Sequence, residues 1–397
     1  MTADAAQQVS GSGTSQSLAY PVLGVLDEDF GTTSAFQSLM QTGHGFGETS
    51  IPHGASVARV AANALDMSSI ADLVPQALEI SLSHGDLVDT FAAALLNADR
   101  LDVATASWGV GKPFGDDFSD PAFAGAKAAI DTAVTEGRGG LGTNLVFAAG
   151  NARGSGDNVN HHGFQNSPET IAVGALDAEG QPADFSTPGA SVLVSARGVD
   201  VPLETEETGN GTTVSGTSFA APKVSATVAR MLEANPELGY RDVQEILAAT
   251  ADPTTVSLSQ ETQGDASAGT GELASGTSVN AASTWNAGGF AFNERVGFGA
   301  LDGDAAVRVA KHWDETRTEE NLAEATATVT GSHAIPDDGE SALRVPFQLD
   351  ENIRAEHVSV DIDVDHNWIG DLTVTLISPE GTRSTVLDRP GRAPNDP

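Results

Sequence analysis

The stretch VSGTSFAAPKVSA, residues 214–226, places a serine one turn ahead of an apolar helix. Apolar side chains recur at helical spacing after Thr217, at Phe219, Ala220, Ala221, Val224, Val228, Met231 and Leu232. Pro222 fits the start of a helix, because the first turn has no backbone acceptor for the N–H that proline lacks. Ser218 is therefore predicted at a helix start, where free N–H groups and the helix dipole favour negative charge.

An N-capping role explains a serine at this place but not its surroundings. Gly216 and the small residues around Ser218 leave room for another molecule to approach the backbone closely. A nucleophile needs that room, so we interpret Ser218 as a candidate nucleophile. A nucleophilic serine in turn needs a base, and the base needs an orienting carboxylate.

The base and the carboxylate are predicted from two other stretches. His53 begins an amphipathic helix in PHGASVARVAANAL (52–65), where the helix dipole disfavours positive charge, so capping does not explain it. In YPVLGVLDEDFG (20–31), Asp27 ends an apolar run that reads as a buried strand, whereas Asp29 reads as a loop residue. Sites in open α/β sheets collect at the carboxyl ends of strands, which makes Asp27 the candidate carboxylate.

A side-chain amide completes the set. In TNLVFAAGNARGSGD (143–157), residues 145–149 read as another buried strand, and Asn151 follows its end at the same rim. A Gly-Asn pair after a strand, taken alone, reads as a turn. An amide donor aimed at a developing oxyanion stabilises acyl transfer, and the combination of four such pieces favours this catalytic interpretation.

These stretches resemble the motifs of the subtilisin-like serine proteases, in the chain order Asp, His, Asn, Ser. GTSFAAP resembles the serine signature of that family, HGASVA its histidine box, GVLD its aspartate strand and AAGN its oxyanion asparagine. The resemblance implies that Asp27 orients, His53 is the base, Ser218 attacks, and Asn151 with the Ser218 backbone N–H holds the oxyanion. The sequence departs from the family where Asp29 replaces a glycine and where the histidine box reads His-Gly-Ala rather than His-Gly-Thr.

The order of predicted elements indicates the fold class. Strands are predicted near 22–27, 76–82, 101–107, 144–149 and 170–176, alternating with helices near 53–65, 86–97, 121–136, 217–234 and 240–250. This alternation predicts an α/β fold with a mostly parallel sheet covered by helices on both faces, and the resemblance narrows it to the subtilisin-like fold. The Ser/Thr/Gly-rich residues 257–278 are expected to form a surface insertion, whose SGTS leads into no apolar helix.

Further stretches resemble the kexin and furin branch, among them TASWG (105–109) and LEANPELGYRDVQEIL (232–247). HVSVDIDVDHNWIGDLTVTLISPEGT (357–382) resembles the opening strands of the P domain of that branch. Alternation independently predicts strands there, at Val358, Val360, Ile362, Val364, Leu372, Val374 and Leu376. We expect a flexible leader, a subtilisin-like catalytic domain, a linker and an incomplete P domain of β-sandwich type, at 1–18, 19–313, 314–341 and 342–397.

The resemblance also implies substrate contacts. Residues 105–109 and 80–84 are expected to flank the substrate as antiparallel edge partners, with Ser107, Trp108 and Gly109 as substrate-binding residues. The substrates are expected to be proteins or peptides.

Kexin and furin cleave after basic residues because carboxylates line their primary pocket. In this sequence Lys112 and His162 stand where two of those acids align, although Asp116 or Asp117 can loop back. Glu28 keeps a carboxylate for the neighbouring subsite. A cation in the pocket repels a basic side chain, so we expect a relaxed or only mildly basic cleavage preference.

Bound Ca²⁺ is a further implication of the resemblance. Asp157 matches a calcium ligand of the family, six residues beyond the oxyanion asparagine. A second candidate set of oxygen ligands lies in the β-rich end, at Asp361, Asp363, Asp365 and Asp371. The glycine-rich calcium loop expected after the histidine helix is not visible in residues 64–81.

Composition limits the function classes. The 55 acidic and 19 basic residues give a net charge of −36, which argues against nucleic-acid binding and fits a secreted or salt-exposed protein. The absence of cysteine excludes disulfides and thiolate metal sites. The sequence has no run of 18 apolar residues, so no membrane span is predicted. We also expect a monomer.

The two ends of the sequence bear on its origin. MTADAAQQVSGSGTSQS has neither the charged n-region nor the apolar h-region of a signal peptide. LDRPGRAPNDP follows too few predicted strands to close a β-sandwich. We expect a fragment of a longer secreted or extracellular protein, or export by a C-terminal signal beyond residue 397.

Two alternatives stand beside the protease hypothesis. Residues 216–220 come within one residue of an α/β-hydrolase nucleophile elbow, but that fold needs its acid and then its histidine after the serine. The later histidines, at 312, 333, 357 and 366, all lie in or beside the linker and the β-rich end. The other alternative is a non-catalytic calcium-binding or adhesive protein on a protease scaffold, which the altered histidine box mildly favours.

Overall fold

A computed structural model of the chain supplies the fold. The residues that the structure describes are 21–27, 53–65, 77–79, 84–96, 101–203, 212–253, 277–283, 288–336, 341–351 and 353–391.

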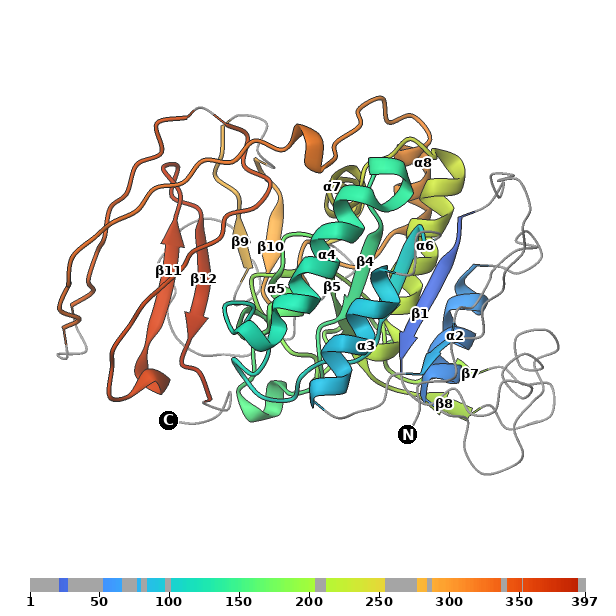
Figure 1. The fold of residues 1–397 in the computed structure, drawn as a ribbon, viewed down its shortest axis with the longest axis horizontal. Coiled ribbons are helices and arrows are strands. Elements are labelled where there is room, and N and C mark those ends of the chain that lie inside the picture. Colours follow the sequence, from blue (N-terminus) through green and yellow to red (C-terminus); the bar gives the residue numbers. More distant parts are fainter. Residues whose placement is uncertain are drawn as a thin grey trace.

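A parallel sheet forms the centre of the described structure (Figure 1). Its strands have the spatial order β2-β1-β3-β4-β5-β6. The strands are β1 Leu23–Asp27, β2 Ala77–Glu79, β3 Val103–Ala106, β4 Asn144–Ala148, β5 Thr170–Leu176 and β6 Val192–Arg197. Each neighbouring pair is parallel. The predicted mostly parallel sheet is therefore confirmed, and β6 is an addition that the sequence reading missed, because no long helix separates it from β5 to mark a crossover.

Helices cover both faces of this sheet, as the uninterrupted apolar strands require. They are α2 His53–Ala64, α3 His84–Leu96, α4 Ala124–Glu136, α5 Gly163–Asn166, α6 Ala221–Ala234, α7 Tyr240–Thr250 and α8 Gly303–Ala310. Leu23, Val103 and Val146 belong to the apolar cluster that includes side chains of α6, α7 and α8. Leu26, Ala104 and Leu145 lie on the same three strands, each an odd number of residues away from those side chains. They therefore point to the opposite face and pack with α3 and α4.

Three small antiparallel sheets surround this core. They pair β7 Val201–Leu203 with β8 Thr212–Val214, β9 Thr277–Val279 with β10 Ala291–Asn293, and β11 Thr373–Ile377 with β12 Arg383–Asp388. The prediction of a strand at Val358–Val364 is wrong for this structure, in which those residues form no strand. Val358, Val360 and Ile362 are exposed, and a strand requires a neighbouring ladder, which these residues lack within the described part of the chain.

The C-terminal hairpin lies at the opposite end of the molecule from α2 (Figure 1). The hairpin and the segment that precedes it both contact the α/β part through side-chain bonds. The Asn160 side-chain amide donates to the carbonyls of Thr385 and Val386 at 3.1 and 3.2 Å. The Arg241 guanidinium on α7 binds both carboxylate oxygens of Glu356, at 2.7 and 2.9 Å. Among the described residues, no helix combines the length and apolar character that crossing a membrane requires.

Candidate active site

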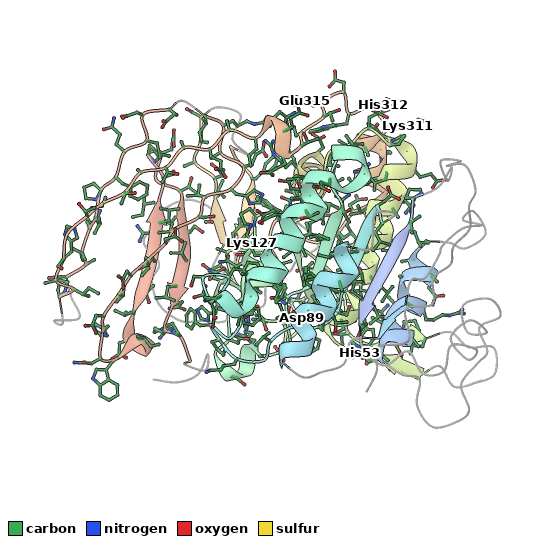
Figure 2. The ribbon with its side chains drawn as sticks, in the orientation of Figure 1. His53, Asp89, Lys127, Lys311, His312 and Glu315 are labelled. Atoms are coloured by element: carbon green, nitrogen blue, oxygen red, sulfur yellow. The ribbon has the colours of Figure 1, made fainter. Side chains whose placement is uncertain are left out.

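The predicted site residues gather at the carboxyl edge of the parallel sheet. Asp27 is the last residue of β1, while Ser107 and Asn151 follow the ends of β3 and β4. Because β1, β3 and β4 are parallel neighbours, these strand ends meet at one rim. His53 is the first residue of α2 and lies in the lower part of the view in Figure 2.

Asp27 and His53 form a directed pair. The His53 Nδ1 atom lies 2.9 Å from Asp27 Oδ1. Asp27 is fully buried at the end of its strand, whereas 38% of the His53 side chain is exposed. A carboxylate only accepts hydrogen bonds, so this contact places the imidazole proton on Nδ1 and leaves Nε2 as the accepting nitrogen of the neutral ring.

Ser218 lies in a 3₁₀ turn, Thr217–Phe219, that leads directly into α6. The ring of Phe219 lies 5.6 Å from the ring of His53, which brings the serine turn beside the imidazole. The Ser218 hydroxyl donates to the Ser107 carbonyl at 3.2 Å, and the Ser107 hydroxyl donates back to the Ser218 carbonyl at 2.9 Å. The two reciprocal bonds fix the serine turn to the end of β3.

Gly216 precedes this turn with φ 153° and ψ 157°, a conformation that residues with a side chain rarely adopt. A Cβ atom at Gly216 would lie 3.5 Å from the amide nitrogen of Asn151. The glycine therefore allows the turn and also keeps the space in front of that amide open, which explains the small residues noted in the sequence.

The Asn151 side chain is oriented by Thr217. Its Oδ1 accepts the Thr217 backbone N–H at 2.9 Å and the Thr217 hydroxyl at 3.0 Å. Because a backbone N–H can only donate, the oxygen of the amide must face Thr217, and the NH₂ group faces away. The Thr217 hydroxyl also accepts the Gly150 N–H at 3.1 Å.

Thr217 is thus a functional residue that the sequence reading did not single out, although it stands in the quoted stretch. Its side chain is fully buried. The sequence signal that could have identified it is a polar side chain next to a candidate nucleophile, in a run of small residues.

The predicted substrate-binding residues have different surroundings. Ser107 binds the nucleophile turn, as described, and a Cβ at Gly109 would lie 3.0 Å from the Gln165 amide nitrogen. Trp108 packs edge-on against Phe91 and Phe164 at 5.2 and 5.0 Å, inside an aromatic cluster under the rim. The prediction for Glu28, like that for residues 80–83, lies outside the described residues.

His162 and Asp157 meet in one buried cluster with Asp116. His162 Nδ1 lies 2.9 Å from Asp116 Oδ1, and His162 Nε2 lies 3.0 Å from both oxygens of Asp157. Asp116 is fully buried, and only 5% of His162 and 9% of Asp157 are exposed. Burial lowers the pKa of the His162 ring, but the hydrogen bonds and charges of both carboxylates outweigh it and raise the pKa to about 9.

This arrangement does not fit Ca²⁺ at Asp157. Calcium takes about six to eight oxygen ligands, whereas the Asp157 carboxylate faces a ring nitrogen of His162. Because a carboxylate only accepts hydrogen bonds, this contact requires a proton on that nitrogen. Within the described part of the chain, no three histidine, aspartate or glutamate side chains are grouped so as to hold a metal ion. The second candidate set, Asp361, Asp363, Asp365 and Asp371, consists of exposed side chains. The geometry therefore gives no support for calcium at Asp157, and calcium binding by the chain stays a prediction.

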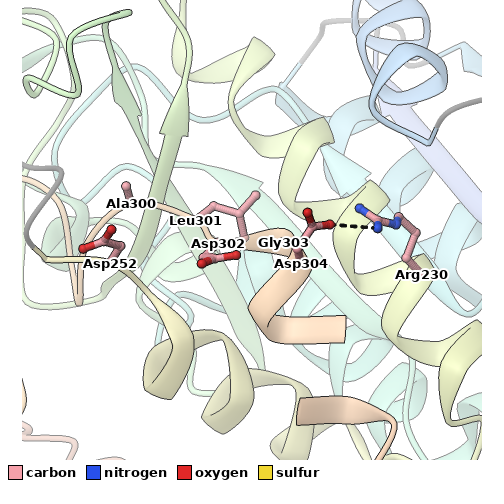
Figure 3. Close-up of a pocket in the computed structure, with 7 residues that line it drawn as sticks. All are labelled: Arg230, Asp252, Ala300, Leu301, Asp302, Gly303 and Asp304. Atoms are coloured by element: carbon pink, nitrogen blue, oxygen red, sulfur yellow. Dashed lines mark hydrogen bonds and ion pairs between the residues drawn. The ribbon is translucent and has the colours of Figure 1, made fainter. Parts of the chain in front are cut away.

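A separate hollow lies beside α6 and α8, lined by Arg230, Asp252, Ala300, Leu301, Asp302, Gly303 and Asp304 (Figure 3). Arg230 pairs with Asp304 at 3.1 Å, and Asp302 caps α8 by accepting the Ala305 N–H. Arg230 lies roughly 15 Å along α6 from the turn of Ser218, at a helical rise of about 1.5 Å per residue. The hollow contains no nucleophile–base pair and is not part of the site.

The fold and the rim define a class of protein. A serine at a helix start, an imidazole held by a buried carboxylate and an amide with its NH₂ group directed away from Thr217 form the constellation of a serine hydrolase. The family model described as the subtilase family (Peptidase S8) matches residues 43–299, and that of the proprotein convertase P-domain matches residues 355–396. The chain belongs to the subtilase family.

Its curated relatives include kexins and proprotein convertases. Kexin of Saccharomyces cerevisiae is 30% identical over 319 residues, which are 77% of this chain and 36% of that protein. The dibasic-processing endoprotease of Schizosaccharomyces pombe is 31% identical over 277 residues, 66% of this chain and 36% of that protein. Proprotein convertase subtilisin/kexin type 6 of Rattus norvegicus is 29% identical over 335 residues, 78% of this chain and 32% of that protein. The chain spans about a third of the length of these three relatives.

Solved structures agree on the fold. A serine protease of Aeromonas sobria, in the crystal structure of its complex with a chaperone, is similar with a TM-score of 0.64 and 20% identity. The similarity covers 95% of this chain and 74% of that one. At this identity the likeness supports the fold alone, and it includes the C-terminal part as well as the sheet.

Proposed function

We propose that this chain is a serine endopeptidase that hydrolyses peptide bonds through an acyl-enzyme on Ser218. The observation that carries the proposal is the buried Asp27 carboxylate on His53 Nδ1, beside a serine turn whose neighbouring amide has its NH₂ group directed away from Thr217. Membership of the subtilase family and the kexin and convertase relatives support it.

In the proposed reaction, the Ser218 hydroxyl exchanges the Ser107 carbonyl for His53 Nε2 as its acceptor and attacks the substrate carbonyl. His53 takes the proton and later returns it to the leaving amine, while Asp27 stabilises the imidazolium without taking its proton. Asn151 Nδ2 and the Ser218 backbone N–H hold the oxyanion, which has its full charge only in the tetrahedral intermediate. Water then attacks the acyl group with His53 again as base, and Ser218 is released.

Active-site labelling tests the proposal directly. A fluorophosphonate probe is expected to label the intact protein and to fail on the Ser218→Ala variant. Ser119→Ala is the control, because it removes the hydroxyl of an exposed serine and retains Ser218, so labelling should be unchanged. Failure to label the folded, unmodified protein would favour the non-catalytic scaffold, which no observation in the structure specifically supports.

We further propose a relaxed or mildly basic preference for the residue on the acyl side of the cleaved bond. Asp116, which the sequence analysis names as one of two acids that can loop back, contacts His162, and a cationic ring there compensates its charge. Lys112 is exposed, so its charge does not block a basic substrate side chain from inside the primary pocket. Profiling on a peptide library tests the preference, and near-exclusive cleavage after Lys-Arg or Arg-Arg would contradict it.

Protein or peptide substrates and a place outside the cell are part of the same proposal. The net charge of −36 favours cationic peptides over nucleic acid. A monomeric state is proposed as well, and light scattering of the purified chain tests it.

A further inference from the structure

Two loops meet under the rim of the proposed active site, and one histidine joins them. The loop after β3 carries Ser107, which binds the serine turn, and further along it carries Asp116. The loop after β4 carries Asn151 and ends in Asp157 and His162. The Asp116–His162–Asp157 cluster is therefore the place where the two loops that flank the nucleophile are tied together.

The geometry of the cluster determines its charge. Each ring nitrogen of His162 lies within 3.0 Å of a carboxylate oxygen. A neutral imidazole has one donor and one acceptor, so it can satisfy only one of two carboxylates. An imidazolium donates at both nitrogens and satisfies both, so the ring is the positive member between two negative ones.

Burial makes that cation necessary. Asp116 is fully buried, and Asp157 is 9% exposed. Two carboxylates held together with so little water need a positive charge between them, because their mutual repulsion and loss of hydration both oppose folding. A divalent metal ion meets this need in many proteins, and in this cluster the ring occupies the place between the oxygens.

Backbone contacts show that the two loops fit around the ring. The Phe114 N–H donates to the His161 carbonyl at 2.9 Å, and the Phe164 N–H donates to Asp116 Oδ2 at 3.4 Å. A Cβ atom at Gly163 would lie 2.2 Å from the Asp116 carbonyl oxygen. The loops approach too closely at that point for any residue other than glycine.

We propose that His162 is the resident cation of these two loops, in the position that a divalent metal ion would otherwise fill, so that this side of the active site is assembled without calcium. His162 is a positioning residue in this proposal, since it touches neither the nucleophile nor the base. The proposal goes beyond the proteolytic function and does not depend on it.

Thermal unfolding tests the proposal in the full chain carrying Ser218→Ala, which excludes self-digestion and makes the result independent of protease activity. His162→Gln is expected to lower the melting temperature in excess EGTA by roughly 5 °C or more, because it leaves two buried carboxylates without their cation. Excess CaCl₂ should restore part of this loss, and adding Asp157→Asn to the variant should abolish that restoration.

His161→Gln is the matched control. The His161 ring is as buried as that of His162 and lies tilted against Phe114, with the ring centres 4.6 Å apart. Its Nδ1 atom lies 4.0 Å from Asp157 Oδ1, and neither of its nitrogens has a hydrogen-bond partner among the described residues. Burial lowers the pKa of the His161 ring, so this ring is the neutral counterpart of His162. Its replacement should lower the melting temperature less, with no restoration by CaCl₂. Equal losses without calcium restoration in both variants would show that ring packing, not charge, holds the loops, and would overturn the proposal.

The protein with His162 intact provides the decisive comparison. Asp157→Asn should leave the response of the melting temperature to CaCl₂ unchanged. If it abolishes a calcium-induced rise, a metal ion binds Asp157 and the proposal fails. If His162→Gln does not fold, ¹⁵N-histidine NMR of the Ser218→Ala protein decides, because the proposal requires a proton on both nitrogens of the His162 ring.

Discussion

The orientation of Asn151 by Thr217 gives a graded prediction about catalysis. Replacing Asn151 by alanine removes the side-chain donor of the oxyanion hole, and loss of one such donor lowers kcat about 100- to 1,000-fold, or about 2.7–4 kcal/mol. Thr217→Val has the same shape but removes only the hydroxyl, so Asn151 Oδ1 keeps the Thr217 backbone N–H at 2.9 Å. The amide is then held by one bond instead of two.

The size of the valine effect follows from that single bond. A neutral hydrogen bond contributes about 0.5–1.5 kcal/mol, and about 1.4 kcal/mol corresponds to a tenfold change in rate, so kcat should fall roughly 2- to 10-fold. KM should change little, because the oxyanion donors act mainly in the transition state. The Gly150 N–H also loses its acceptor, so the melting temperature should fall moderately.

A chromogenic peptide assay measures the decrease in kcat of both variants, with the concentration of active enzyme determined by active-site titration at Ser218. Thr217→Ser retains the hydroxyl and is the control, so its kcat should stay close to that of the unmodified protein. If Asn151→Ala lowers kcat by less than threefold, the oxyanion role is refuted, because loss of that donor is expected to lower kcat roughly 100-fold or more. A serine variant as slow as the valine variant would refute the role of the hydroxyl.

Three further predictions concern the base, the cation and the C-terminal part. Ser218→Ala and His53→Ala should each lower kcat by several orders of magnitude, with peptide binding retained in a competition assay. Because the pKa of His162 is raised to about 9, its stabilisation is fully present below its unfolded pKa of about 6.5 and is lost as the pH rises through about 9. The melting temperature should therefore fall over that range, by an amount equivalent to roughly 3 kcal/mol, and urea titrations of His162→Gln should lack this component. Arg241→Lys should weaken the two-bond contact with Glu356, lower the unfolding free energy by roughly 1–2 kcal/mol and speed limited proteolysis of the C-terminal part, whereas unchanged proteolysis would show that this contact does not hold it.

The residues at strand ends and helix starts could be predicted from sequence because backbone geometry places them. Asp27 and Asn151 follow strands that read as buried, and parallel strands end at one edge whatever their loops do. His53 and Ser218 begin helices whose apolar spacing is visible in the chain. Only local patterns were needed, and the fold brought them together.

The partners within loops could not be predicted in the same way. Asp116 and His162 are 46 residues apart, and no periodicity links them. The sequence predicted Trp108 to contact substrate. Whether an aromatic side chain after a strand faces the rim or the core depends on its packing partners, here Phe91 and Phe164, which come from other elements. Val358–Val364 had the alternation of a strand, yet alternation indicates only which side chains share a face and does not supply a ladder.

The proposed role of His162 as the cation of the two loops, in place of a metal ion, has a physical consequence for the conditions in which the site stays assembled. Occupancy of a metal site follows the concentration of free ion, so stability gained from a metal ion is lost when the ion is scarce. A tethered imidazolium is present at a fixed local concentration, and its contribution depends on pH instead. With the pKa of His162 near 9, the cluster keeps its cation throughout the neutral range and loses it in alkaline solution. The proposed internal cation therefore replaces dependence on calcium with dependence on pH, in a chain whose net charge of −36 attracts cations in general.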